Sequence, residues 1–234
     1  MLQYEEHAPP EALASKVQCI WTLRGEGNPT HIDRILPDGS FELVFHRGDV
    51  FVEGGRPQPR TMLIGHLRQA VLVAQGACVD VTGMRVRPGG FHALTGLHAG
   101  ELAGEVHDLR DAFGEDELEP LIAKLSKRPG EADARVDAAV AVIMRRNGQL
   151  RIARLAAALN VSERTLERLF RQHVGLSPKE LARVARFQAE ISGSTGAYFD
   201  DSHRNREFRE IAGATPAVVF AERTELADAF LPAR

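Results

Sequence analysis

The stretch IARLAAALNVSERTLERLFRQHVGLSPKELARVARF, from Ile152 to Phe187, governs how the second half of the chain folds. Asn160-Val161 divides it, and Ser162 then supplies a side-chain oxygen that can cap a new helix. The residues before the division carry an apolar stripe at helical spacing, made of Ile152, Leu155, Ala156 and Leu159. The stretch therefore predicts two short helices joined by a tight turn.

The second of these helices, residues 162–173, is amphipathic. Its apolar side chains gather on one face and are Leu166, Leu169 and Phe170. At about 100° per residue, three basic side chains point the opposite way, and these are Arg164, Arg168 and Arg171. Two short helices, a tight turn and an outward basic row predict a helix-turn-helix, whose second helix lies in the major groove of DNA.

The neighbouring residues predict helices that buttress this pair. Gly175 can take the left-handed conformation that ends a helix, and Ser177-Pro178-Lys179-Glu180 has the pattern of a capping box. A third helix then has apolar residues at Leu181, Val184, Ala185 and Phe187. An opening helix before the pair has its stripe at Val136, Ala139, Val140 and Ile143.

Two segments, Leu159–Phe170 and Val174–Lys179, closely resemble the first helix-turn-helix of AraC/XylS-type transcription regulators. The resemblance resumes further on and covers roughly the last hundred residues, at Tyr198–His203, Arg206–Arg209 and Gly213–Pro216. It implies sequence-specific binding of double-stranded DNA by a motif at 150–174, with 162–173 as the recognition helix. We therefore expect an all-α DNA-binding domain over 129–234, after a boundary at Lys127–Glu131.

The resemblance also implies roles for single residues. The positions that match those facing base edges are Arg164, Glu167 and Arg168. Arginine suits guanine N7 and O6, and a glutamate can accept from cytosine or exclude bases sterically. Phosphate contacts, which position the protein without specifying a sequence, are expected at Arg171, Lys179 and Arg183. In the second motif, the outward residues are His203 and Arg206.

That second motif, residues 198–216, departs from the family pattern. Where the family has a short helix before Tyr198, residues 192–196 have loop composition. Arg204 stands where the family has a large apolar residue that packs on that helix. The two changes are consistent, because an apolar side chain at position 204 would have no helix to pack on. We therefore expect an intact first motif and a degenerate second one. We expect Asp200 and Asp201 to cap a helix rather than to bind a metal.

The residue pattern of the front half predicts short β-strands separated by turn residues. The predicted strands are Val17–Leu23, His31–Leu36, Phe41–Val44, Met62–Ile64, Val71–Val73 and Cys78–Val86. Pro37-Asp38-Gly39 predicts a turn, and the alternation from Phe41 to His46 predicts a strand with one buried face. Helical runs follow at 91–97 and 116–125. The fold class is therefore α+β, with a β-rich barrel or sandwich-like domain over 1–128 followed by the helical domain.

This half resembles the uncharacterised β-rich domain that precedes the DNA-binding unit in some AraC-type regulators. The residues that carry the resemblance are Trp21–Leu23, Leu36–Gly39, Glu42–Phe45 and Gly83–Gly90. The resemblance implies a regulatory domain that senses a small-molecule effector or mediates dimerisation, and it names no ligand.

The residues of the front half predict no catalytic, cofactor or metal site. Its candidate metal ligands include no close helical pair beside a third ligand, and they are His66, His92, His98 and His107. Ser40 has no adjacent base, and Asp38 is expected as a turn residue. The aromatic side chains expected in the core, or around a pocket, are Trp21, Phe41, Phe45 and Phe91.

Composition and charge favour a cytoplasmic regulator. No apolar run approaches the ~20 residues of a membrane span, and the acidic start lacks a signal-peptide core. Cys19 and Cys78 are too few for a disulfide framework or a cysteine-rich zinc site, so we expect buried free thiols. The net charge is -3, yet residues 145–186 hold ten Lys and Arg against three Asp and Glu. A basic block confined to the helix-turn-helix is the pattern expected for phosphate contact.

Two other classes of protein remain open. One is a non-DNA-binding relative that regulates through protein contacts, for example by trapping a homologue in heterodimers; salt-dependent DNA affinity separates the two. The other is an enzyme domain fused to a helical reporter, as in DNA-repair proteins with AraC-like units. Those use a four-cysteine zinc site that two cysteines cannot build, so we expect no enzyme.

Overall fold

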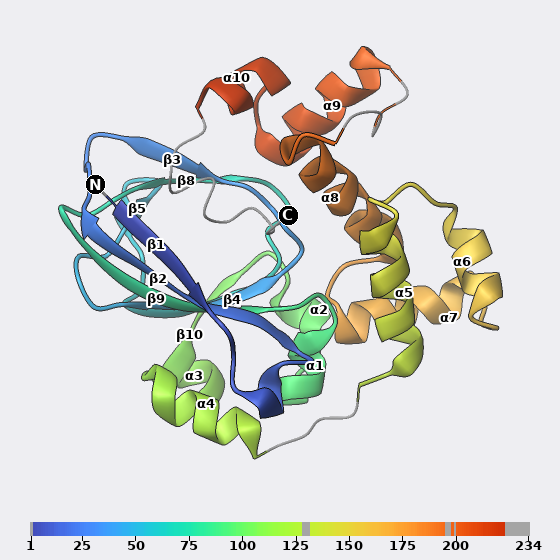
Figure 1. Cartoon of the computed structure of the whole chain (residues 1–234), viewed down its shortest axis with the longest axis horizontal. Helices are drawn as coiled ribbons and strands as arrows, with labels where there is room; N and C mark the ends of the chain where they lie inside the picture. The colour runs from blue at the N-terminus through green and yellow to red at the C-terminus, as the bar shows by residue number, and fades with distance from the viewer. Residues whose placement is uncertain (1, 128–131, 195–197, 199, 223–234) are drawn as a thin grey trace.

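The computed structural model describes residues 2–127, 132–194, 198 and 200–222. A β-rich front half and a helical back half lie side by side (Figure 1), so the expected α+β fold is confirmed. Among the described residues, every helix is too short or too polar to cross a lipid bilayer. Most of the predicted boundary falls on residues 128–131, which lie outside the described part, so domains 1–128 and 129–234 stay a prediction.

Two antiparallel sheets build the front half. The larger sheet has the order β1-β2-β9-β4-β7-β10, with bounds β1 Leu2–His7, β2 Val17–Glu26, β9 Cys78–Val86, β4 Phe41–His46, β7 Thr61–Ile64 and β10 Val106–Asp108. The smaller sheet has the order β3-β8-β5-β6, with bounds β3 Ile32–Ile35, β8 Val71–Ala74, β5 Val52–Glu53 and β6 Arg56–Pro57. Apolar side chains of both sheets meet between them, including Trp21, Val44, Met62, Val73 and Val81.

The β4 strand differs from its prediction. All six residues from Phe41 to His46 are buried, whereas the alternation predicted one exposed face. Phe41, Leu43 and Phe45 join a core that includes helical residues, and Val44 faces the second sheet. A strand paired on both edges and covered on both faces has no solvent side, so the polar residues on its second face are buried.

Short helices complete the front half. They are η1 Glu11–Leu13, α1 Gly90–Thr95, α2 Ala99–Leu102, α3 Leu109–Phe113 and α4 Leu118–Ser126. Phe91 stacks on Phe41 with ring centroids 4.1 Å apart, and Leu121 is fully buried in the same core. The helical runs predicted at 91–97 and 116–125 therefore exist as α1 and α4, with ends shifted by a few residues.

The two cysteines have different surroundings. Cys19 on β2 is buried, as predicted. Cys78 is exposed, so the prediction of a buried thiol is wrong there. Cys78 is the first residue of β9 and pairs with Glu26, the last residue of β2. The end of β2 is exposed, and the thiol lies beside it.

The back half is a set of six helices in the described residues. Their bounds are α5 Ala134–Arg145, α6 Ile152–Ala158, α7 Glu163–His173, α8 Pro178–Ile191, α9 Asp201–Ala212 and α10 Pro216–Ala221. The predicted stripes of α5, α6, α7 and α8 form one apolar core, which includes Ile143, Leu155, Phe170 and Leu181. Gly148, at a φ of 66°, lets the chain after α5 pass so close to α8 that a Cβ there would lie 1.8 Å from the Ala182 carbonyl oxygen.

The two halves are packed and hydrogen-bonded to each other. Leu36 from the front half lies in one apolar cluster with Phe187 and Phe208 from the back half. The Ala70 amide donates to the Ile211 carbonyl oxygen at 2.7 Å. Helices α8 to α10 therefore cover the region around β3 and β8 (Figure 1).

Candidate nucleic-acid interface

The predicted recognition helix forms as α7 and follows a tight turn after α6. Asn160 in that turn has a φ of 54°, a left-handed conformation that asparagine tolerates better than most residues. The Ser162 hydroxyl accepts a hydrogen bond from the Thr165 amide at 3.1 Å, which confirms the predicted cap. The turn therefore ends one helix and starts the next within a few residues.

The inner face of α7 holds the helix to its own domain. Leu166 and Phe170 are fully buried, and Leu169 is 4% exposed. They belong to a core shared with α5, α6 and α8. Because that face is buried, the opposite face of α7 is presented to solvent.

The outer face of α7 is basic. Arg164, Arg168 and Arg171 are exposed, and so is Glu167 between them. None of the ion pairs among the described residues involves these three guanidinium groups. Three cations without internal carboxylate partners can contact base edges and phosphates.

The start of α8 extends the basic surface. The Ser177 amide donates to the Glu180 carboxylate at 2.7 Å, and the Glu180 amide donates to the Ser177 hydroxyl at 3.2 Å. The predicted capping box is therefore confirmed. Lys179, in the first turn of α8, is exposed.

Arg183 lies in a different environment from the one predicted. Its Nε donates to Glu207 at 2.9 Å, and its Nη2 donates to Glu210 at 2.5 Å. Glu207 is also 3.4 Å from Arg186, so one buried carboxylate holds two arginines of α8. This arrangement gives Arg183 two internal carboxylates in place of the phosphate that the sequence predicted.

The C-terminal end of α7 rests on the front half, beside α1 and α2 (Figure 1). The His66 ring is fully buried, and its Nε2 donates to the Val174 carbonyl oxygen. The ring of His92 lies edge-on to His173, with centroids 4.3 Å apart. Burial lowers the pKa of His66 to about 4. A neutral histidine thus joins the halves next to the recognition helix.

The other histidines singled out in the sequence lie apart. His98 is exposed, and His107 lies with its Nε2 3.5 Å from the Glu105 carboxylate. In the described part of the chain, no group of three or more metal-ligating side chains is arranged to hold an ion.

A second candidate site is a cavity of about 140 Å³ inside the front half. Its walls are mainly apolar and include Trp21, Leu23, Val44, Met62 and Val73. Its polar lining residues include Asp38, Ser40, Glu42, His46 and Gln58. Apolar walls with a few polar groups are typical of small-molecule sites. Of the predicted aromatic residues, Trp21 lines this cavity, whereas the other three lie in the core.

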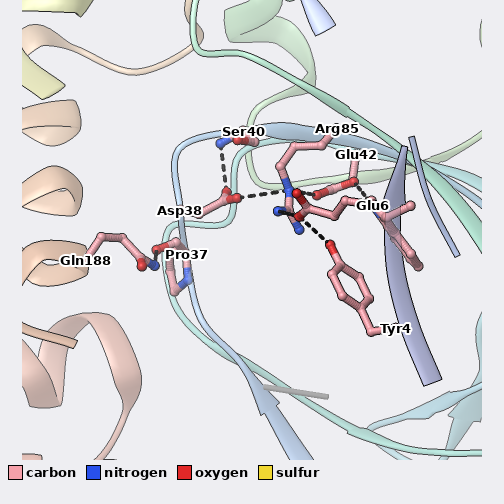
Figure 2. A network of polar contacts seen from close by, with 9 residues as sticks. Tyr4, Glu6, Pro37, Asp38, Ser40, Glu42, Arg85 and Gln188 are labelled. Carbon is pink, nitrogen blue, oxygen red and sulfur yellow. Dashed lines mark hydrogen bonds and ion pairs between the residues drawn. The ribbon is translucent and has the colours of Figure 1, made fainter. Parts of the chain in front are cut away.

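A network of charged side chains lies beside the cavity, with Arg85 and Glu42 buried, Asp38 half-buried and Glu6 exposed. Figure 2 shows Glu6, Asp38 and Glu42 pointing toward the Arg85 guanidinium. Arg85 Nε donates to Glu42 at 2.6 Å and lies 3.6 Å from Asp38, and Arg85 Nη1 lies 3.5 Å from Glu6. Trp21 Nε1 donates to Glu42 at 2.9 Å. Burial raises the pKa of Glu42, and the charge of Arg85 opposes that rise.

The sequence did not indicate this network. The predicted alternation put Glu42 on a solvent-facing side of its strand, and Arg85 was not singled out. One signal could have found them: Arg85 lies between Met84 and Val86 in a strand of apolar residues. A charge at such a position needs a buried partner. Asp38 has the predicted turn role, since its carboxylate accepts from the Ser40 amide at 2.8 Å.

Comparison with known proteins identifies the helical half. Residues 146–181 match the family of bacterial regulatory helix-turn-helix proteins, AraC family. The chain therefore contains an AraC-type helix-turn-helix. Its function is therefore DNA binding and transcription regulation. Residues 5–108 match a domain of unknown function, DUF6597. No curated protein matches the chain.

Solved structures of ToxT from Vibrio cholerae are similar to this AraC-type chain. One is 11% identical, with 95% of this chain and 99% of that chain covered and a TM-score of 0.48. Another, from strain O395 and bound to (E)-4-(8-methylnaphthalen-1-yl)but-3-enoic acid, is 11% identical over 95% and 99% of the chains, with a TM-score of 0.46.

The second motif of this AraC-type chain lies beyond the matched residues. Asp200 caps α9 by accepting from the His203 amide at 2.7 Å, as predicted. Arg206 is exposed, whereas His203 is only half exposed and has its ring centroid 5.6 Å from that of Tyr198. The described residues between α8 and α9 contain no helix, and the loss of the short helix there stays a prediction.

Arg204 shows how the chain accommodates that loss. Its Nε lies 2.7 Å from the Glu190 carboxylate on α8, and its guanidinium lies 5.6 Å from the centre of the Phe208 ring. A long side chain can cover apolar surface while its charged end is paired. Arg204 therefore covers Phe208 where an apolar residue and a further helix would be expected.

Proposed function

We propose that this regulator reads its operator with α7 of the first helix-turn-helix. Arg164, Glu167 and Arg168 face base edges in the major groove, and Arg171 and Lys179 contact phosphates. The observation that carries the proposal is the exposed row of arginines on α7, none of which is ion-paired to a described carboxylate. The net basic charge of residues 145–186 supports it.

The role of Arg168 can be tested directly. A bidentate contact from arginine to guanine contributes about 1–3 kcal/mol of discrimination, so Arg168→Ala should weaken cognate binding about 5- to 150-fold. Binding to unrelated DNA should change much less. Mobility-shift titrations on both DNAs measure this, with Arg56→Ala on exposed β6 as a matched control. An equal loss on both DNAs would contradict base reading by Arg168.

A single intact motif gives each chain few contacts with DNA. We propose that two chains act together, because linking two weak sites raises the overall affinity steeply. His203 and Arg206 then contribute at most additional contacts at the degenerate motif. DNA selected by the protein should contain two half-sites separated by whole helical turns. A single isolated half-site, bound by one chain, would contradict a dimer.

We propose that the front domain is a sensor rather than an enzyme, with its effector in the cavity between the two sheets. The turn Pro37-Asp38-Gly39 supports this, because it touches both the cavity and the helical half. Asp38 lines the cavity, and the Pro37 carbonyl oxygen accepts from Gln188 on α8 at 2.6 Å (Figure 2). A Cβ on Gly39 would lie 2.9 Å from Leu181 of α8. A ligand that moves this turn would move α8, which packs on α7. As a regulator of bacterial type, the protein would act in the cytoplasm.

A further inference from the structure

The cavity has room for one small ligand. Its volume of about 140 Å³ lies between the two sheets. An apolar cavity of about 150 Å³ is large enough to hold benzene. The ligand that fits is therefore one ring or a short alkyl chain with a polar head.

The charges around the cavity have one sign. The carboxylates that line it are Asp38, Glu42, Glu53 and Glu105. No Lys or Arg among the described residues lines it. Behind the wall, Arg85 is the cation that faces Glu6, Asp38 and Glu42, so three carboxylates share one guanidinium (Figure 2). The wall around Asp38 and Glu42 therefore holds more carboxyl groups than cations.

A buried histidine also lines the cavity. His46 is 3% exposed, and its ring interacts with the Gln58 side chain and the Asp49 backbone. The side chain of Gln58, which interacts with this ring, lines the cavity too. Burial lowers the pKa of His46 to about 4, so the ring is neutral near pH 7 and adds no positive charge.

We propose that the cavity binds a small organic cation, an ammonium or amidinium group on a single apolar ring or short chain. The charged head lies toward Asp38 and Glu42, and the apolar body lies against Trp21 and Val73. A carboxylic acid of the same size would place a further carboxylate beside Asp38 and Glu42, with no additional cation to pair with it. This inference rests on the proposed sensing function and adds the chemical class of the effector.

Three probes of equal size test the charge preference at pH 7.5, namely benzylamine, benzyl alcohol and benzoate. The chain has one tryptophan, Trp21, which lines the cavity, so its fluorescence reports occupancy directly. We expect saturable binding of benzylamine, at least tenfold tighter than that of the alcohol or the acid. Equal binding of the three probes, tighter binding of benzoate, or no change at Trp21 with any probe would overturn the proposal.

A matched pair of variants assigns the preference to the cavity. Asp38→Asn keeps an oxygen that can accept from the Ser40 amide, and it should lower benzylamine affinity at least fivefold while leaving benzyl alcohol unchanged. Asp111→Asn, on exposed α3, should change neither. Thermal unfolding checks that both variants fold. If Asp38→Asn does not fold, Glu53→Gln, at the half-buried rim of the cavity, provides a second test of the same prediction. Unchanged benzylamine affinity in a folded cavity variant would overturn the proposal.

The experiments distinguish two proposals, namely that the cavity senses an effector and that this effector is a cation. If benzoate binds best and also alters DNA affinity, the cavity is a sensor for an anion and the class is wrong. If no probe changes Trp21 fluorescence while the protein still binds DNA, both the class and the sensing role fail, and the DNA-binding function stands.

Discussion

The arginines of the helical half differ in whether a carboxylate of the same chain pairs with them. An arginine without such a partner is free to contact DNA. Arg183 is held by Glu207 and Glu210, which follow it by 24 and 27 residues. Arg168 on α7 has no such ion pair among the described residues. The sequence predicted a phosphate contact for Arg183 because this residue lies one helical turn after Lys179. Nothing local in the sequence shows that carboxylates of α9 approach it.

Glu207 is the carboxylate on which this arrangement depends. Glu207→Gln should lower the free energy of unfolding by about 1–3 kcal/mol, because it leaves two arginines facing a neutral group in a buried place. Glu210→Gln removes a carboxylate that is 52% exposed and should cost less than about 1 kcal/mol. Urea denaturation of both variants measures the difference. Similar losses for the two would show that the buried carboxylate has no special role.

At the level of single elements, the helices of the DNA-binding half were predictable because their signals are local. The caps Ser162 and Ser177, the turn at Asn160 and the apolar stripe of α7 all lie within a few residues of the structures that they specify.

The front half was less predictable because its structure depends on distant partners. Strand β1 was missed, since its residues are mostly polar and exposed and its place is set by pairing with β2 and by contacts such as that of Glu6 with Arg85. Glu42 and Arg85 meet because β4 and β9 are adjacent, although the residues are 43 positions apart. A single sequence shows that a strand exists more readily than it shows which strand lies beside it.

Gly148 provides a test of packing between two helices. Gly148→Ala would place a Cβ 1.8 Å from the Ala182 carbonyl oxygen, whereas Gly96→Ala at a similar φ of 74° meets nothing within 4 Å. Both variants carry backbone strain of about 1 kcal/mol or more. Only Gly148→Ala must also separate α5 from α8, so its melting temperature should fall much further. Equal shifts in calorimetry would mean that the close approach is unimportant.

For the whole molecule, the contact between the halves is the feature that local signals do not predict. Leu36 packs with Phe187 and Phe208, and Gln188 reaches the Pro37 carbonyl oxygen. His66 closes the same contact from the other side by donating to the Val174 carbonyl oxygen. The turn between α7 and α8 therefore rests on the front half while the arginine face of α7 stays open.

Burial of His66 makes this contact sensitive to pH. Its folded pKa of about 4 lies below the ordinary value of 6.5, so between these values the unfolded chain binds the proton and the folded chain does not. The carboxylates of Asp38 and Glu180 oppose this shift only in part. Stability should therefore fall from pH 6.5 toward pH 4, by up to about 1.4 kcal/mol per pH unit from this group.

The variant His66→Gln tests that dependence, because a glutamine amide can still donate to Val174 but does not titrate. Urea unfolding at several pH values should give a shallower fall in stability for the variant than for the native protein. Parallel curves would show that His66 does not contribute to the pH dependence.

The DNA-reading role of α7 can be measured by selecting bound sequences from random DNA at two salt concentrations. The native protein should enrich one sequence with two half-sites, and its affinity should fall as salt rises because phosphate contacts release counterions. A protein with Arg164, Arg168 and Arg171 all replaced by alanine should enrich nothing, while a variant with Arg56→Ala should select the native sequence. If the triple variant selected the same sequence as the native protein, or if the native protein enriched none, α7 would not be the element that reads DNA.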